Sequence, residues 1–451
     1  MQVFHLAQAL TPDGVVTDVR LEARDGVIAT ISAGAARDPA ATYVPGLTLP
    51  GMPNLHSHAF QRGMAGLSET RGASDDSFWT WREVMYRFLD RLTPEDAQAI
   101  AAQAYVEMLE SGFTAIAEFH YLHHDIDGRA YAHVGAMAQA IADASRETGL
   151  GLTLLPVLYR YGGFGAVAPN HGQRRFICDL DLFAKLMESS ARAISSLPDA
   201  RLGVAPHSLR AVALDDLAFC RDVTDGPIHI HIAEQMKEVN DSIAWSGKRP
   251  VELLFDSASV DSRWCLIHAT HLTVDERNRI AASGAIAGLC PITESSLGDG
   301  IFDGVNYREA RGRYGVGTDS NIEIGVAPEL RTLEYSQRLR DQRRGRMADS
   351  GASVGRTLFE ESAAGGAQAC GRRIGKLAAG HRCDLVTLDI DHPTLVGRSG
   401  DALIDSAIFA ATQFPVTEVR VGGERVVENG RHKARDAIAK RYAATMRKLT
   451  A

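Results

Sequence analysis

The segment TLPGMPNLHSH, residues 48–58, gives the first indication of how the chain folds. It is a short apolar stretch, broken by glycine and proline, that ends in two histidines two positions apart. Because residues i and i+2 of a strand point to the same side, His56 and His58 can bind one ion together. The pair alone is a weak signal, since surface histidines near a turn give the same pattern.

Seven further segments of this kind follow, separated by helix-like stretches. They are TAIAEFHYL (114–122), GLTLLPVLY (151–159), RLGVAPHS (201–208), PIHIHIAEQ (227–235), CLIHATH (265–271), GAIAGLCP (284–291) and RYGVGTDS (313–320). Residues 93–112, between the first two of the eight segments, begin with Thr93 and end with Gly112, which are helix start and stop signals. Apolar strands that alternate with helices predict parallel strands covered on both faces. The eight units predict an α/β fold of the (β/α)8 TIM barrel type.

Both ends of the chain have a different pattern, with short alternating stretches and turn signals. The signals are Asp25-Gly26 near the start and Gly422-Gly423 and Asn429-Gly430 near the end. We predict two domains: residues 1–48 plus 376–451 form a smaller composite β-sandwich, and residues 49–375 form the barrel. The long interval 160–200 is expected to hold extra loops and helices over the barrel mouth.

Composition limits the classes of protein to which the chain can belong. The hydrophobic share of 45% and the charged share of 23% are typical of a globular protein. The net charge of −8 argues against a nucleic-acid or anionic-membrane partner. The start lacks the pattern of a signal peptide, no apolar run reaches about 18 residues, and the six cysteines show no CxxC pair. We therefore expect a cytoplasmic protein with reduced thiols and a small-molecule substrate.

Polar residues cluster at the carboxyl ends of the predicted strands, which meet at one face of a barrel. His56, His58, His231 and Asp319 provide three imidazoles and one carboxylate. This set suits one divalent ion, zinc first and iron as the alternative, with a position left for water. Such an ion can lower the pKa of bound water from about 15.7 towards 7 and so supply a hydroxide nucleophile.

Two further residues complete a hydrolytic set. Glu234 follows His231 by three positions and can protonate a leaving nitrogen, and His268 can polarise the substrate. Asp319 can bind the ion and also accept a proton from water. We prefer His231 to His229 as a ligand because of the HxxE spacing. A further set of histidines is expected either to be structural or to support the ligand residues from behind: His120, His123, His124 and His271.

The motifs HSH, HIAE, LIHATH and GVGTDS, together with IGKLAAGHRCDLVTLD, resemble the amidohydrolase superfamily over nearly the whole chain. The resemblance is to its mononuclear aminohydrolase branch, which removes ammonia from C=N centres. Binuclear members carry a bridging lysine at the end of the fourth strand. Here that strand reads RLGVAPHSLR, with His207 and no lysine, which favours a single metal.

Within that branch, HSHAFQRGMAG, SFWTWREVMY, GFTAIAEFHYLHHD, APHSLR and GTDSN are similar to the formimidoylglutamate deiminase family, the N-formimino-L-glutamate iminohydrolases. The resemblance implies a homodimeric hydrolase of C–N bonds other than peptide bonds, acting in histidine degradation. It would convert N-formimidoyl-L-glutamate and water to N-formyl-L-glutamate and ammonia by attack of a metal-bound hydroxide. It implies the metal and proton-transfer residues named above and, as substrate-binding residues, Gln61, Arg82, Tyr121, His207 and Arg210.

The chemistry of such a substrate agrees with these residue types. A dicarboxylate needs forked cationic partners, and Arg82 and Arg210 can each form bidentate bonds. The alternative is a deaminase of a ring substrate such as guanine, cytosine or an adenosine derivative, whose site favours stacking and amide contacts over two arginines. An inactive scaffold is a further alternative, against which the presence of all metal and proton-transfer positions argues.

Overall fold

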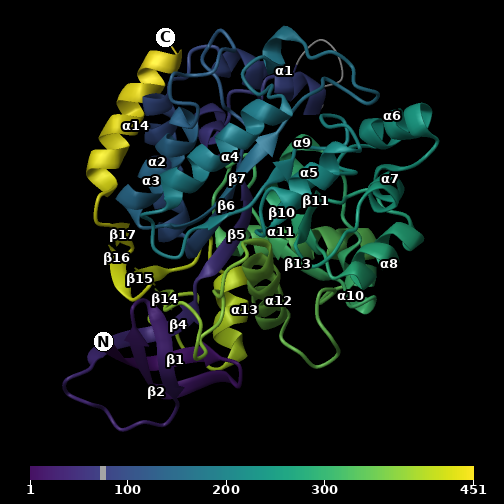
Figure 1. The fold of residues 1–451 in the computed structure, drawn as a ribbon. Coiled ribbons are helices and arrows are strands. Elements are labelled where there is room, and N and C mark those ends of the chain that lie inside the picture. Colours follow the sequence, from purple (N-terminus) through teal and green to yellow (C-terminus); the bar gives the residue numbers. More distant parts are fainter. Residues whose placement is uncertain (72–77, 451) are drawn as a thin grey trace.

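The computed structural model describes residues 1–71 and 78–450 (Figure 1). The strands from the two ends of the chain form one eight-stranded sheet in the order β17-β16-β15-β14-β4-β1-β2-β3. This sheet lies at one end of the molecule, beside the N-terminus (Figure 1). Its strands are β1 (Gln2–Thr11), β2 (Gly14–Arg24), β3 (Val27–Ser32), β4 (Thr42–Pro50), β14 (Leu385–Leu388), β15 (Val416–Val421), β16 (Glu424–Glu428) and β17 (Arg431–His432).

Three hairpins of this sheet turn where the sequence predicts. Asp25 and Gly26 join β2 to β3 with φ values of 51° and 78°. Both central residues of a type I′ turn require positive φ, which Asp, Asn and Gly tolerate best. The pairs Gly422-Gly423 and Asn429-Gly430 also have positive φ and join β15 to β16 and β16 to β17. The turn residues thus match the backbone conformation at the tips of these three hairpins.

The middle of the chain forms two parallel sheets, in the orders β5-β6-β7-β8 and β10-β11-β12-β13, with β9 paired to β7. Their strands are β5 (Met52–Ser57), β6 (Phe113–His120), β7 (Gly151–Leu158), β8 (Arg201–Leu202), β9 (Ala205–Pro206), β10 (Ile228–Ile232), β11 (Trp264–His268), β12 (Ile286–Leu289) and β13 (Arg313–Val316). Single bridges join the sheets at both edges, Val204 to Ile228 and Ser57 to Asp319, so the strands close into a ring. Each of the eight predicted segments contributes to this ring, and the fourth is divided into β8 and β9.

Helices alternate with these strands and cover the ring, which confirms the predicted α/β character (Figure 1). The described helices are η1 (Ala59–Met64), α1 (Phe78–Leu89), α2 (Pro94–Glu110), α3 (Ala136–Thr148), η2 (His171–Gln173), α4 (Leu180–Ile194), α5 (Asp216–Asp222), α6 (Met236–Ser246), α7 (Pro250–Ser257), α8 (Val274–Ser283), α9 (Pro291–Leu297), α10 (Gly304–Glu309), α11 (Val326–Asp341), α12 (Val354–Ala369), α13 (Asp401–Phe409) and α14 (Arg435–Thr450). The interval 160–200 holds η2 and α4.

Helix α2 begins where capping predicts. The Thr93 hydroxyl accepts a hydrogen bond from the Asp96 backbone N–H at 3.3 Å, and the Asp96 carboxylate accepts one from the Thr93 N–H at 3.1 Å. This reciprocal pair satisfies two N–H groups that the first turn leaves without helical partners. The C-terminal helix α14 packs along α2, with Lys448 Nζ 2.7 Å from Asp96. The two ends of the chain thus contact the central unit on different sides (Figure 1).

All six cysteines are buried and free, as predicted for reduced thiols. Among the described helices, none combines the length and the apolar character that a membrane span requires.

Candidate functional site

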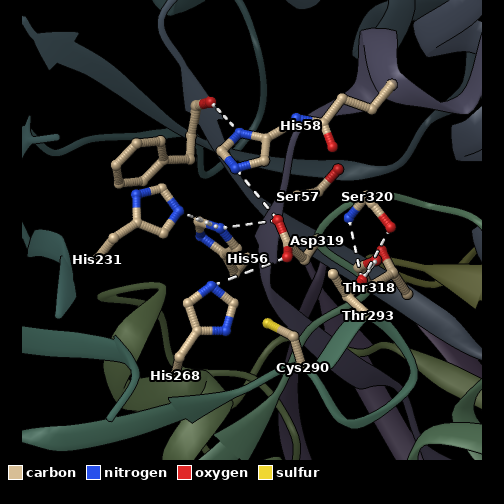
Figure 2. Close-up of polar contacts among 12 residues, drawn as sticks. His56, Ser57, His58, His231, His268, Cys290, Thr293, Thr318, Asp319 and Ser320 are labelled. Carbon is tan, nitrogen blue, oxygen red and sulfur yellow. Dashed lines mark hydrogen bonds and ion pairs between the residues drawn. The ribbon is translucent and has the colours of Figure 1, made fainter. Parts of the chain in front are cut away.

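Four side chains from the carboxyl ends of three strand segments converge on one point (Figure 2). His56 is on β5 and His58 directly follows it, His231 is on β10, and Asp319 follows β13. Their nearest ligand atoms all lie within 4.8 Å of one another, and each residue is at most 6% exposed. Residues 56 and 319 are far apart in sequence, and the closed ring of strands brings them together.

The distances define a compact centre. Asp319 Oδ1 lies 3.3 Å from His56 Nε2 and 3.2 Å from His58 Nε2, and the Nε2 atoms of His56 and His231 lie 3.1 Å apart. Backbone bonds lock β5 to Asp319: the Asp319 N–H donates to His56 O, and the His58 N–H donates to Asp319 O, both at 2.9 Å. The relative positions of the two elements are therefore fixed by the backbone.

Hydrogen bonds determine which ring nitrogens carry hydrogen. His58 Nδ1 lies 2.9 Å from Phe119 O, and His231 Nδ1 lies 3.1 Å from His207 O. A carbonyl only accepts, so each Nδ1 is the donor, and the Nε2 atom of each ring is left to face the centre. The Nε2 atoms of His56, His58 and His231 and the Asp319 carboxylate thus lie 3.1 to 3.3 Å from their neighbours, an arrangement that a cation between them would stabilise. Burial also lowers the pKa of His56 to about 3, which keeps its ring neutral. The donor set therefore fits a divalent metal ion.

The loop that carries Asp319 adopts an unusual backbone conformation. Asp319 has φ 44° and Asn321 has φ 55°, in the left-handed region that non-glycine residues rarely occupy. Side-chain bonds hold it there: Thr318 Oγ1 accepts from Asn54 Nδ2 at 2.7 Å and donates to Asn321 Oδ1 at 2.6 Å. The Asn321 amide also donates to Ser57 Oγ at 3.1 Å. Such conformations concentrate at functional sites, where the surrounding contacts offset the strain.

Beside this centre lies a pair of groups suited to proton transfer. His268 Nε2 is 3.7 Å from Glu234 Oε1 and 3.9 Å from Asp319 Oδ2, while His268 Nδ1 is 3.3 Å from Glu294 Oε1. Burial opposes the charged form of His268, but the carboxylates of Glu234, Glu294 and Asp319 outweigh it and raise its pKa to about 10. Burial raises the pKa of the Glu234 carboxyl, although His268 and Arg210 act against it. This leaves a buried histidinium next to a carboxyl whose protonated form is favoured by burial.

A cavity opens onto this group. The predicted metal ligands His58, His231 and Asp319 line it, as do Glu234 and His268. All five predicted substrate-binding residues also line it: Gln61, Arg82, Tyr121, His207 and Arg210. Two of these five contact each other, because Gln61 Nε2 donates to the Tyr121 hydroxyl at 2.9 Å. The cavity thus combines two arginines with the proton-transfer pair.

Several residues of the cavity have no signal in the sequence. Its apolar wall includes Trp81, Met85, Tyr86, Tyr159, Phe176 and Leu297. Apart from Tyr159, which directly follows β7, these residues lie on helices and loops, where no strand-end rule applies. Glu294, on α9, contacts His268 but follows no strand-end polar pattern. Only a three-dimensional contact with His268 identifies it.

The other histidines named in the sequence either bond main-chain carbonyls or are buried outside the four-residue centre. His229 lies outside the four-residue centre, and its Nε2 bonds Ala369 O at 2.8 Å. The others bond main-chain carbonyls through their Nε2 atoms: His123 with Val157 O at 2.9 Å, His124 with Ile177 O at 2.8 Å and His271 with Asp299 O at 2.7 Å. His120 is buried away from solvent at 4% exposure.

Comparisons with known proteins agree with this geometry. Residues 47–426 match the model of the amidohydrolase family, and residues 1–42 match that of the formimidoylglutamate deiminase HutF N-terminal domain. The chain is 48% identical to a formimidoylglutamate deiminase of Pseudomonas aeruginosa over 100% of both chains. It is 28% identical to a 5-methylthioadenosine/S-adenosylhomocysteine deaminase of Natronomonas pharaonis, with 97% of this chain and 96% of the other covered.

Among solved structures, an amidohydrolase from Brucella melitensis superposes with a TM-score of 0.96 at 48% identity over 100% of both chains. The family match covers most of the chain, and the strand-end centre described above lies within it. The chain therefore belongs to the amidohydrolase family, and its first residues match the N-terminal domain of the formimidoylglutamate deiminases.

Proposed function

We propose that the protein hydrolyses N-formimidoyl-L-glutamate to N-formyl-L-glutamate and ammonia, a step of histidine degradation. The observation that carries this proposal is the joint lining of one cavity by two arginines and the Glu234–His268 pair, directly beside the four-residue centre. The 48% identity to a formimidoylglutamate deiminase over the full length supports it.

His56, His58, His231 and Asp319 are the residues that would hold one divalent ion, with zinc as the first choice and iron as the second. Three imidazoles and a carboxylate suit either metal. When bound, the ion supplies a Lewis acid that makes a coordinated water acidic enough to attack near neutral pH. The two oxygens of Asp319 face different partners, since Oδ1 approaches His56 and His58 and Oδ2 approaches His268. One oxygen can thus bind the ion while the other accepts a proton.

The proton-transfer pair acts on the formimidoyl carbon and its nitrogen. His268, with its raised pKa, can donate a hydrogen bond where negative charge develops. Glu234, at 3.7 Å from His268, can pass a proton to the departing nitrogen so that ammonia leaves. The apolar wall of the cavity limits access of bulk water, which strengthens both interactions.

Two cationic side chains at the cavity suit the two carboxylates of the substrate. Arg82 and Arg210 both line the cavity, and each guanidinium offers a planar fork of donors. Arg210 Nη2 also lies 4.0 Å from Glu234 Oε2, so carboxylate binding and the proton donor are adjacent. Gln61, Tyr121 and His207 add neutral groups to the same wall.

A panel assay for ammonia release distinguishes this function from that of a ring deaminase. Metal-loaded protein is given N-formimidoyl-L-glutamate, guanine, cytosine and S-adenosylhomocysteine in parallel. We expect ammonia and N-formyl-L-glutamate from the first compound only. Release from a ring compound alone would replace the proposed substrate, and no release from any would favour an inactive scaffold.

We propose that the closed ring of strands, within residues 49–375, is a (β/α)8 barrel, and that residues 1–48 plus 376–451 form a composite β-sandwich domain. The eight-stranded sheet built from both chain ends supports this division, although α14 of the second range packs against α2.

The free buried cysteines support a cytoplasmic location. A homodimer stays a prediction from the resemblance, to be checked by sedimentation.

A further inference from the structure

We propose that Tyr159 is a further substrate-binding residue, whose hydroxyl donates a hydrogen bond to one carboxylate of a dianionic substrate. This inference rests on the proposed function, since it concerns recognition of the dicarboxylate at the same cavity. Tyr159 directly follows β7, at the carboxyl end of the strand, and lines the cavity.

A buried glutamine fixes the orientation of the Tyr159 hydroxyl. Gln173 is 1% exposed, and its Oε1 accepts the Asn170 backbone N–H at 2.9 Å. That contact assigns the two ends of the amide, so the group facing Tyr159 is the Nε2 donor, at 2.7 Å from the hydroxyl oxygen. The oxygen of Tyr159 is therefore an acceptor in this bond, and its own hydrogen is left for another partner.

Nothing in the described part of the chain takes that hydrogen: the only hydrogen bond of the Tyr159 side chain there is the one from Gln173. Tyr159 is 6% exposed and lines the cavity. Its ring packs against His207 with centroids 4.5 Å apart, so the phenol has little freedom to turn away. The available donor direction is thus the cavity.

The electrostatic surroundings favour an anion at this position. Arg210, a permanently charged side chain, lines the same cavity as Tyr159. A carboxylate bound by Arg210 would offer an acceptor oxygen to a neighbouring hydroxyl, and hydrogen bonds to charged acceptors are the strong ones. Tyr121 is in a different situation, because its hydroxyl accepts from Gln61 and donates to Met85 Sδ at 3.1 Å. Tyr159 is therefore better prepared than Tyr121 to bind a carboxylate.

The test measures binding, so that it does not depend on turnover. Metal-loaded wild-type protein and Tyr159→Phe are titrated by calorimetry with three ligands: N-formyl-L-glutamate, 4-formamidobutyrate, which lacks the carboxylate next to nitrogen, and N-formyl-L-2-aminobutyrate, which lacks the distal one. We expect Tyr159→Phe to weaken N-formyl-L-glutamate binding about 10- to 100-fold. The loss of affinity should persist with the truncated ligand that keeps the carboxylate bound by Tyr159. It should disappear with the truncated ligand that lacks this carboxylate.

Two variants complete the experiment. Tyr161 lies two positions after Tyr159 and does not line the cavity, so Tyr161→Phe is the matched control. This variant should bind all three ligands with the affinity of the wild type. Gln173→Met keeps the tyrosine but removes its anchor, and should weaken dicarboxylate binding by a smaller factor; it also tests the proposal if Tyr159→Phe does not fold.

Unchanged affinity in both Tyr159→Phe and Gln173→Met, or an equal loss for all three ligands, would overturn the assignment of Tyr159. Ammonia release by the wild type is measured separately. If the wild type releases ammonia and Tyr159→Phe binds the dicarboxylate with unchanged affinity, only the assignment of Tyr159 is refuted. If the wild type neither releases ammonia nor binds the dicarboxylate, the proposed function is refuted as well.

Discussion

His268 and Glu294 form a buried histidine–carboxylate pair, with His268 Nδ1 3.3 Å from Glu294 Oε1. The same oxygen accepts the Cys290 backbone N–H at 2.8 Å, which anchors the carboxylate at the start of α9. Because Glu294 contacts the ring nitrogen away from the reacting groups, it can fix the orientation of His268 while Nε2 faces Glu234 and Asp319. We infer that Glu294 is a positioning residue for His268.

Glu294→Gln tests this role. The amide keeps the shape but loses the charge that stabilises the histidinium, so we expect kcat to fall about 10-fold with KM and metal content unchanged. Ser295→Ala is a suitable control, because that exposed neighbour bonds only Pro291 O and does not touch His268. A Glu294→Gln protein whose KM rises while kcat is retained would assign Glu294 to substrate binding instead.

Glu234→Gln and His268→Asn test the proton-transfer pair. Each change removes a group that moves or donates a proton but leaves the four-residue centre intact. We therefore expect kcat to fall by about 10²–10⁴ in each variant while bound metal is retained. Steady-state kinetics with elemental analysis checks both quantities, and near-wild-type turnover in either variant removes that residue from the mechanism.

A buried guanidinium stabilises the segment that leads to the cavity. Arg175 is 1% exposed and bonds three main-chain carbonyls, those of Leu89, Leu92 and His124. Arg175→Met removes these three bonds from a buried site, and only the Leu89 carbonyl keeps another donor among the described residues, the Leu92 N–H at 3.3 Å. The free energy of unfolding should therefore fall by about 3 kcal/mol or more.

The neighbouring Arg174 is the control for burial, since its side chain is 18% exposed and its guanidinium pairs with Asp90 at 2.8 Å and donates to Ile126 O and His171 O. Arg174→Met should lower the free energy of unfolding by less than Arg175→Met does. Chemical denaturation of both variants measures the difference, and equal losses would show that burial of Arg175 is not what matters.

His432 lies outside the cavity and should make the free energy of unfolding depend on pH. Burial lowers the pKa of His432, although the hydrogen bond from Nε2 to Thr148 O at 2.9 Å acts in the opposite direction. Nδ1 accepts the Ala434 N–H at 3.1 Å, so a second proton there would break that bond. The unfolded chain thus binds more protons below pH 6.5, so stability is present above about pH 6.5 and is lost as the pH falls. Each unit of pKa difference contributes about 1.4 kcal/mol.

The measurement compares wild type with His432→Gln by denaturation at pH 7.5 and pH 5. The metal centre is common to both proteins, so its own pH dependence cancels in the difference. We expect the wild type to lose more stability on acidification than the variant does. Parallel curves would mean that His432 does not titrate differently on unfolding.

The sequence predicts the positions of the strands and of the metal-type residues because both depend on local rules. The apolar segments that end in His56 and His58, or in Asp319, can be recognised directly in the sequence. A closed ring of parallel strands then brings the carboxyl ends of these segments to the same face. Turn residues such as Asp25 and Gly26 likewise reveal their conformation through positive φ. These features need no knowledge of distant contacts.

The contacts of the cavity wall could not be predicted in this way. Tyr159 and Gln173 meet only because the loop after β7 folds back on itself, and Glu294 reaches His268 from a short helix. Pairings of this kind depend on tertiary geometry, and no periodicity in the sequence encodes them. The resemblance to a family supplied the five candidate substrate-binding residues, whereas residue patterns alone would have left Gln61 and Tyr121 unremarkable.

The most direct test is a metal titration of activity. Protein freed of metal by chelation is titrated with Zn²⁺, and in parallel with Fe²⁺, while ammonia release from N-formimidoyl-L-glutamate is recorded. We expect activity to rise in proportion to added metal and to end at one equivalent per chain. Full activity of the metal-free protein, or a plateau only at two equivalents, would contradict a single ion held by His56, His58, His231 and Asp319.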